Sequence, residues 1–429
     1  VFQNAEEQLV TYTVFDEIAF AAENYCFSEI EIKKRVITIA QSLGIQDLLE
    51  RSIYQLSGGE KQKVILASNL VTNPKILILD EPLAFLDNKG KDQLVHLIKN
   101  IHKSNPKMAI VIVEHRYQPF SQLLSRLFIL DKHGSVLFSG KSKEFRSLKR
   151  DTKEIPLRDF INNKTRGSNK LEIDPKRKKP EDGIPPLISI QNISFQYPNT
   201  ITGHSQIEEL SLDVEKGEFL GIIGPNGSGK TTLLYLMCKI LTPYEGHIYF
   251  KGKELKSIED SKLLPKIGFI FQNPENQIFE GTIEEEILYG PKNFRELAPD
   301  SLKGKSVNGI YGEDLEALIN LIGEKRLKET EMKKLNPFCL SWGQKRRLNL
   351  SSIFSYSPEL LLIDEPFIGQ DVQSIKKIMA ILKNYHAQNK TIVLISHDTT
   401  ILRKYCSRII DISSINSRKP KEPTISTFP

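Results

Sequence analysis

A glycine-rich segment followed by lysine and threonine stands between two apolar stretches in the second half of the chain. It reads Gly224-Pro225-Asn226-Gly227-Ser228-Gly229-Lys230-Thr231-Thr232. The apolar run Phe219–Ile223 before it predicts a strand, and Thr232–Leu241 after it predicts a helix. In that setting the glycines turn backbone N–H groups toward an anion, and the helix N-terminus adds its dipole. The segment therefore predicts an ATP-binding loop in which Lys230 reaches the β- and γ-phosphates and Thr231 binds Mg²⁺.

Two adjacent acids end a second apolar run, Leu360–Ile363. A continuous apolar run of this length is typical of a parallel strand buried on both faces, and such sheets bind ligands at the carboxyl ends of their strands. We therefore expect Asp364 to hold Mg²⁺ through water and Glu365 to act as the general base that activates the attacking water.

Four segments recur in the same order along the chain, which indicates an internal repeat. The pairs are Val1-Phe2-Gln3-Asn4 with Ile270-Phe271-Gln272-Asn273, Leu56–Glu60 with Leu340–Gln344, Ile76–Pro82 with Leu360–Pro366, and Val113–His115 with Ile395–His397. The offset grows after the first pair, which predicts an insertion of about 15 residues in the second copy. Its Gly-, Ser- and Asp-rich composition near Ala298–Gly312 is that of a loop.

The repeat divides the chain into four parts. Residues 1–150 form a first copy, 151–186 a basic flexible linker, 187–415 a second copy and 416–429 a flexible tail. The second copy has a front part, about Leu187–Phe269, that has no counterpart in the first. Because the chain begins with Val1 inside a repeated motif, we interpret it as a fragment in which the first copy lacks its phosphate loop.

Composition restricts the function further. The chain has 429 residues, 39% of them hydrophobic, which is enough for two cores and too much for a disordered protein. We find no run of about 18 apolar residues. The four scattered cysteines suggest neither a zinc site nor an iron–sulfur cluster, and they fit a reducing compartment. Much of the net charge of +6 arises between Lys141 and Lys179, where a solvated linker is the simplest interpretation.

The Asp-Glu-Pro segment at 364–366, and Leu-Ser-Gly-Gly-Glu at 56–60 some 20 residues before its own Asp-Glu-Pro, resemble the ATP-binding-cassette family. The resemblance covers nearly the whole chain outside the linker and tail. It implies a tandem α/β fold of the P-loop NTPase type, with a mostly parallel sheet, flanking helices and a helical subdomain that carries the signature. It also implies an ATPase that uses ATP and Mg²⁺.

The same resemblance assigns roles to matching residues. Tyr197 would stack on adenine, Gln272 would sense Mg²⁺ and the attacking water, and His397 would contact the γ-phosphate. Asp87 and Asp371 match the acid that meets the opposite domain. The predicted catalytic residues are thus Glu365, His397 and Gln272, the metal ligands Thr231, Gln272 and Asp364, and the opposite domain's ATP contacts Ser57, Gly58 and Gly59.

In this family two cassettes pair head to tail, so each ATP lies between one phosphate loop and the other domain's signature. One composite site is complete in this chain, because the second copy has the phosphate loop and the first copy has the signature. The other would use counterparts that include Gln3, Asp80, Glu81, His115, Ser341 and Gly343. Trp342 replaces the family's glycine in that signature. We expect its large side chain to obstruct close contact between the backbone and the phosphate. A glycine-type backbone conformation would also be costly for tryptophan, so we expect this site to hydrolyse ATP slowly. The alternative is that Trp342 tilts outward and the site works.

The segments Phe271–Ile287 and Phe2–Ile18 resemble the ATPases of energy-coupling-factor importers, which take up vitamins and transition-metal ions. This implies a subunit on the cytoplasmic face of the membrane, paired with an integral membrane scaffold protein and a small substrate-capture membrane protein. Acids at Glu275, Glu280 and Glu284–Glu286 suit docking to basic helices, although an acidic helix start is the simpler interpretation of each one.

The alternative function is a soluble tandem cassette that acts on ribosomes or nucleic acid. The run Lys176-Arg177-Lys178-Lys179 favours it, but no basic-aromatic face stands out, so no nucleic-acid partner is expected. An exporter motor is a third possibility, which the glutamine-loop pattern disfavours.

Overall fold

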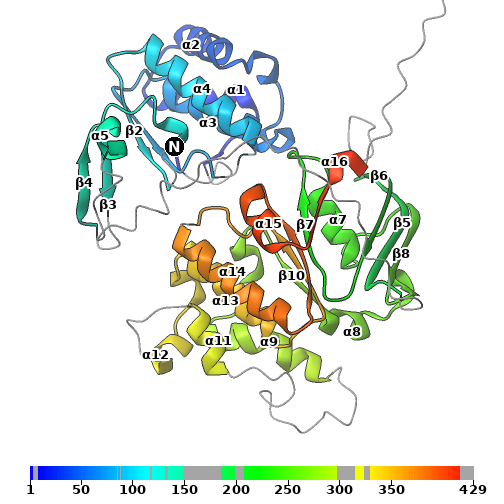
Figure 1. Cartoon of the computed structure of the whole chain (residues 1–429). Helices are drawn as coiled ribbons and strands as arrows, with labels where there is room; N and C mark the ends of the chain where they lie inside the picture. Colours follow the sequence, from blue (N-terminus) through cyan, green and yellow to red (C-terminus); the bar gives the residue numbers. More distant parts are fainter. Residues whose placement is uncertain are drawn as a thin grey trace, which may run out of the picture. The chain divides into compact units, whose positions relative to one another are not determined.

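The computed structural model describes residues 1–2, 8–84, 86, 88–115, 118–130, 134–147, 185–198, 207–296, 315–322, 329–370 and 372–415. They form two compact units, the first drawn almost wholly from residues 1–169 and the second from 170–429 (Figure 1). Gln3, Asp87, Asp371, the predicted insertion at 298–312, the tail at 416–429 and all but the last two residues of the predicted linker lie outside the described residues.

A five-stranded parallel sheet forms the centre of the second unit. Its strands are β7 (Phe219–Ile223), β10 (Ile267–Ile270), β11 (Leu360–Asp364), β12 (Thr391–Ile395) and β13 (Arg408–Asp411), in the order β10-β11-β12-β7-β13. Every residue of β11 and β12 is buried. Burial on both faces explains their unbroken apolar sequences, and the predicted α/β fold is confirmed.

One face of this sheet packs against an antiparallel sheet and a helix (Figure 1). The antiparallel sheet has the order β6-β5-β8-β9, from β5 (Ile188–Phe195), β6 (Ile207–Val214), β8 (Glu245–Phe250) and β9 (Lys253–Glu254). The helix is α7 (Lys230–Met237). It ends before the predicted Leu241 because Cys238 caps it and Lys239 adopts a left-handed backbone, with φ of 64°.

Helices cover the other face of the sheet. Leu361 and Ile363 of β11 are fully buried in a cluster with apolar residues of these helices. The helices of this unit outside the phosphate loop are α8 (Asp260–Leu263), α9 (Ile283–Glu296), α11 (Leu315–Ile322), α12 (Glu329–Lys333), α13 (Trp342–Phe354), α14 (Val372–Ala387), α15 (Thr399–Tyr405) and α16 (Ile412–Ile415).

The first unit repeats part of this plan. Its helices are α1 (Val14–Asn24), α2 (Glu29–Leu43), α3 (Gly58–Leu70), α4 (Asn88–Ser104) and α5 (Ser142–Ser147). Strands β1 (Ile76–Asp80) and β2 (Ala109–Val113) pair in parallel, and β3 (Leu127–Leu130) and β4 (Val136–Gly140) pair antiparallel. The backbone of Val1 hydrogen-bonds to Ile78 and Asp80 on either side of Leu79, at 2.9 Å each, much as Ile270 pairs with Ile363 in the second unit.

The two faces of the β1–β2 pair differ sharply. Leu77 and Leu79 point into the core with the helices, whereas Ile76 and Ile78 are 59% and 56% exposed. On β2, Val111 and Val113 are also about half exposed. One face of this two-stranded sheet is therefore apolar and open among the described residues.

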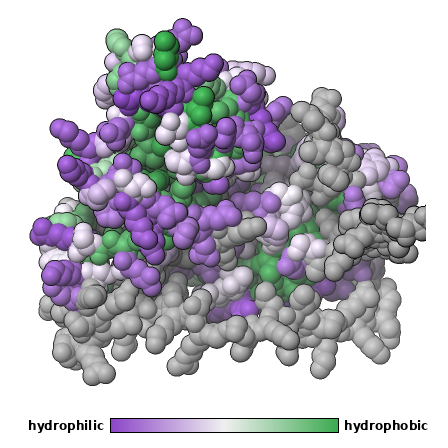
Figure 2. All heavy atoms as spheres, turned by 90° about the horizontal axis from the view of Figure 1, so that it is seen from above, coloured by the Kyte–Doolittle hydropathy of each residue, from purple (hydrophilic) through white to green (hydrophobic). Residues whose placement is uncertain are grey.

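None of the helices in the described parts of the chain combines the length and apolar composition needed to cross a bilayer. On the face drawn in Figure 2, apolar residues are visible between hydrophilic ones.

Candidate functional site

The glycine-rich loop forms a cradle at the start of α7. Gly227 and Gly229 have φ of 77° and 87°, which side chains rarely allow. The Lys230 ammonium donates to the carbonyls of Gly224 and Pro225, at 2.9 Å each, across the loop. The Ser228 hydroxyl is buried and has no hydrogen-bond partner among the described residues. A buried donor without a partner at a helix N-terminus fits a loop shaped to receive phosphate.

Thr231 and Asp364 meet at the floor of this loop. The Thr231 hydroxyl donates to Asp364 Oδ2 at 2.7 Å, although the two residues lie 133 positions apart. Burial raises the pKa of Asp364, and the Thr231 hydroxyl and the Lys230 and Arg346 cations oppose that shift. A hydroxyl and a carboxylate oxygen are ligands that Mg²⁺ prefers, and a bound cation would favour the ionised carboxylate.

Glu365 and His397 lie together at the ends of β11 and β12. The His397 Nε2 atom is 3.3 Å from Glu365 Oε1, and the His397 amide donates to Glu365 Oε2 at 3.2 Å. Glu365 is buried and has φ of 44°, while its amide bonds to Ile395. A left-handed backbone at a non-glycine residue costs about 1–3 kcal/mol, and such strain is concentrated at functional sites.

The first unit reproduces this arrangement. Glu81 has φ of 43°, its amide bonds to Val113, and its Oε1 atom is 2.7 Å from His115 Nε2. A further acid, Glu114, lies beside this pair and accepts the Leu83 amide at 3.1 Å. Burial raises the pKa of Glu114 to about 7. The sequence analysis missed this residue, although it stands where the second copy has Ser396.

Tyr197 contacts the same helix start from the antiparallel sheet. Its hydroxyl lies 3.2 Å from the Thr232 hydroxyl, and its ring meets Phe195 edge-on at 5.0 Å. The structure thus brings Tyr197 beside the phosphate loop.

Gln272 follows β10 and is exposed. Within the described residues, no hydrogen bond joins its side chain to Thr231, Asp364 or Glu365. Its backbone carbonyl is bound instead by Arg346, a fully buried residue of α13 that the sequence analysis did not single out. The only sequence signal that could have drawn attention to Arg346 is that the first copy has Gln62 at the aligned position.

Both signature segments begin a helix with a capping box. Ser57 precedes α3, where its hydroxyl and amide donate to the Glu60 carboxylate at 2.7 and 2.8 Å. Ser341 precedes α13, where its amide donates to Gln344 Oε1 at 2.8 Å and its hydroxyl accepts the Gln344 amide at 3.4 Å. Ser57 and Gly58 are exposed, so backbone N–H groups of this helix start are accessible to an anion.

Trp342 is the first residue of α13 and has a helical backbone. A Cβ added to its counterpart, Gly58, would meet no atom within 4 Å in the described structure. The predicted backbone penalty at Trp342 is therefore wrong, because neither position requires glycine. The size of the Trp342 side chain remains as the argument against rapid turnover at this site. The side chain is half-buried, and its indole N–H has no partner among the described residues.

One predicted docking acid is also corrected. Glu286 is buried, and its carboxylate accepts the amides of Phe279 and Glu280 at 3.1 and 2.9 Å. It therefore shapes the loop before α9 rather than facing a partner. In the first unit Glu17 holds Val10 and Thr11 in the same way, at 3.0 and 2.9 Å.

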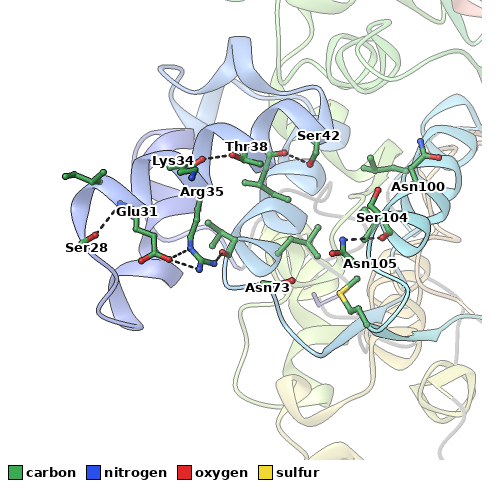
Figure 3. Close-up of a pocket in the computed structure, with 17 residues that line it drawn as sticks. Ser28, Glu31, Lys34, Arg35, Thr38, Ser42, Asn73, Asn100, Ser104 and Asn105 are labelled. Atoms are coloured by element: carbon green, nitrogen blue, oxygen red, sulfur yellow. Dashed lines mark hydrogen bonds and ion pairs between the residues drawn. The ribbon is translucent and has the colours of Figure 1, made fainter.

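The first unit has a groove of about 730 Å³ between α2 and α4, lined by none of the site residues described above (Figure 3). Arg35 lines it, pairs with Glu31 at 2.8 Å and donates to the Val71 carbonyl at 3.0 Å. None of the predicted site residues lines this groove.

Comparison with known proteins gives consistent results. The family profile described as "ABC transporter" matches residues 1–84 and 207–368. A Methanosarcina mazei protein, provisionally named as an ABC transporter ATP-binding protein, is 31% identical over 96% of this chain and 76% of its own. A Bacillus subtilis protein, YkoD, provisionally named for HMP/thiamine import, is 29% identical over 96% of this chain and 73% of its own. The structure of cbiO1 from Clostridium perfringens, described as part of the ABC transporter complex cbiONQ, has 26% identity and a TM-score of 0.43, over 53% of this chain and 84% of that one.

Proposed function

Because the chain belongs to the ABC transporter family and is an ATP-binding, ATP-hydrolysing subunit, we propose that it powers an energy-coupling-factor importer for a vitamin or a metal ion. It would do so from the cytoplasmic face of the membrane, through separate membrane proteins. The single observation that carries the ATPase chemistry is the convergence of the phosphate loop, the Thr231–Asp364 pair and the Glu365–His397 pair in one unit.

In the proposed reaction, the loop amides and Lys230 bind the phosphates, and Tyr197 stacks on the adenine. Thr231, Asp364 and Gln272 would hold Mg²⁺, which neutralises charge on the phosphates when it is bound. Glu365 takes the proton of the attacking water as general base, and its strained backbone fixes the carboxylate at the strand end. His397 orients that carboxylate and contacts the γ-phosphate.

We also propose that residues 1–150, the first copy, are part of a cassette that is fused to the complete cassette of the second unit. Its Ser57, Gly58 and Gly59 would complete the ATP site of the second unit. The open apolar face of β1–β2 supports a missing front part, because the second unit covers the matching face with its antiparallel sheet and α7. The opposite site would contain Trp342 and turn over slowly.

A repeated exposed surface supports docking to membrane partners. Phe279, Tyr289 and Phe338 are each about half exposed, and the Phe279 and Tyr289 rings meet at 4.5 Å. The repeat offsets place Val10, Phe20 and Tyr54 at the matching positions of the first unit, and these are at least as exposed. Apolar groups that stay exposed at the same three positions of both copies favour a partner that contacts both.

Acids beside this surface suit a basic partner. Glu280 lies just before α9, Glu284 and Glu285 lie in its first turn, and none of the three is buried. A protein helix that carries arginine or lysine beside apolar residues would match the surface in charge and hydropathy. These features support a protein partner over the alternative role on ribosomes or nucleic acid.

The test is affinity purification of the tagged protein from detergent-solubilised native membranes, with its partners identified by mass spectrometry. We expect small multi-span membrane proteins in fixed ratio. A variant with Phe279→Ser and Phe338→Ser should lose these partners and keep ATP binding. Recovery of ribosomes or nucleic acid in place of membrane proteins would contradict the importer proposal and leave only the ATPase chemistry.

A further inference from the structure

Helix α13 holds the loop that carries Gln272 by three polar side chains. The Arg346 guanidinium donates to the carbonyls of Phe271 and Gln272. One turn later Asn349 donates to the Pro274 carbonyl at 2.9 Å, and Lys345 forms an ion pair with Glu275. All three donors are buried. Residues 271–275, hereafter the glutamine loop, are therefore held by the helix that begins at the second signature, through three backbone carbonyls and the Glu275 side chain.

Arg346 is an unusual residue for this position in the core. It is fully buried, and a guanidinium removed from water is unfavourable unless hydrogen bonds and a nearby anion compensate. Its two carbonyl acceptors supply part of that compensation, with further attraction from the Asp364 carboxylate, while its Nε atom has no hydrogen-bond partner among the described residues. An apolar residue would fill the same space at lower cost. The planar guanidinium instead fixes two successive carbonyls at once, which gives it geometric specificity.

Among the described residues, the first unit has different contacts at two of these helix positions. The repeat aligns Gln62 with Arg346 and Ile65 with Asn349. The Gln62 side chain donates to the Pro82 carbonyl, in the turn after Glu81, and Ile65 has no side-chain donor. The same helix position thus holds the strand-end turn in one copy and the glutamine loop in the other.

We propose that Arg346 is a positioning residue that fixes the backbone of Phe271 and Gln272, so that Gln272 is presented to the nucleotide-bound metal. The part of the proposal that concerns the metal rests on the proposed function; the part that concerns the loop does not. Because α13 also begins with the second signature, Arg346 joins the glutamine loop of one ATP site to the signature of the other in a single rigid body.

The first measurement is hydrogen exchange in the nucleotide-free protein. Arg346→Gln, which introduces the first copy's residue, should speed exchange of the amides between residues 271 and 279 by about tenfold or more, since two charge-assisted hydrogen bonds are lost. Arg347→Gln is the matched control. Arg347 is a buried neighbour on the same helix, but its Nε donates to the Ile322 carbonyl at 2.9 Å, so its loss should loosen α11 and leave the glutamine loop protected.

The second measurement separates positioning from general destabilisation. Arg346→Gln should raise the Mg²⁺ concentration for half-maximal ATPase activity by about tenfold, as loss of an outer-shell partner does at metal sites, with little change in the KM for ATP. Millimolar methylguanidinium should partly restore the wild-type Mg²⁺ dependence to Arg346→Ala. Equal effects of the 346 and 347 variants on loop exchange, or unchanged loop exchange in Arg346→Gln, would overturn the proposal. If neither the wild-type protein nor any variant hydrolyses ATP, the proposed function fails. The hydrogen-exchange result would still show whether Arg346 fixes the backbone of the glutamine loop.

Discussion

The strands β1 and β11 have nearly the same sequence and very different surroundings. Ile76 and Ile78 are more than half exposed, whereas their counterparts Leu360 and Leu362 have no exposed surface. The next strands repeat the contrast, with Val111 and Val113 half exposed and Val393 and Ile395 fully buried. The difference lies in the cover that the second unit builds from residues 187–269. A continuous apolar strand sequence thus predicts a strand that is adapted to burial on both faces, whether or not the segments that would cover those faces are present.

The largest expected effect comes from a matched pair of alanine substitutions, one in each strand. Leu362→Ala should lower the free energy of unfolding by about 3–5 kcal/mol, because it opens a cavity in a closed core. Ile78→Ala should change it by less than about 0.5 kcal/mol, because that side chain already meets solvent. Denaturant unfolding of both variants measures the difference. Similar losses from both would mean that something covers the β1–β2 face in the protein as purified.

The second test compares the two strand-end glutamates. Glu365→Gln should keep ATP binding and lose at least about 10²-fold in hydrolysis, or about 2.7 kcal/mol in the barrier, through loss of the general base. Glu81→Gln should have a much smaller effect, because no phosphate loop faces it among the described residues. Steady-state ATPase assays with a nucleotide-binding control decide this. Equal losses in turnover would refute the asymmetry between the copies.

The third test uses Glu114, which the second unit replaces with Ser396. Burial raises the pKa of this carboxyl from 4.5 to about 7, so the native state binds more protons than the unfolded state between these values. Stability therefore falls as pH rises through that window. Glu114→Gln should add about 3 kcal/mol at pH 8 and almost nothing at pH 4.5.

Thermal unfolding at the two pH values measures this effect. The exposed Glu23→Gln serves as control, and it should change stability little at either pH. A gain from Glu114→Gln that is the same at both pH values would show that the carboxyl is not penalised by burial.

The smallest expected effect concerns Trp342. In a chain that carries a phosphate loop in both copies, Trp342→Gly should raise ATP turnover by up to about twofold, equivalent to about 0.4 kcal/mol, because a second equal site can at most double it. Single-turnover assays that count the active sites per chain would measure it. No gain would mean that the indole lies outside the contact and that the second site was already working.

Much of this architecture could be predicted from the sequence. The strand Phe219–Ile223 and the strand-end acids lie where the motifs placed them, because a buried parallel strand and a phosphate loop have strong local signatures. The sequence analysis assigned Thr231 and Asp364 separately to Mg²⁺, and the structure brings these two residues, 133 positions apart, within hydrogen-bond distance. The roles assigned to the individual site residues remain predictions.

The errors have two physical causes. The backbone penalty at Trp342 was wrong because a helix start accepts any residue with ordinary φ, and the glycine of the other copy hid that fact. Glu286 was expected at the surface because charge is usually exposed, yet two backbone amides hold it inside. Arg346 was overlooked for the same reason. Which polar groups are buried depends on tertiary partners that no local pattern specifies.

Strand β2 has a consequence for how this protein is made in a cell. Its sequence, Ala109-Ile-Val-Ile-Val113, is uncharged and β-branched in every residue after Ala109, and among the described strands it pairs only with β1. A short edge of this kind is a template on which another nascent chain can add a strand. The interval between synthesis of this segment and burial of its edge is therefore the period in which aggregation competes with folding, and in which chaperone capacity sets the yield.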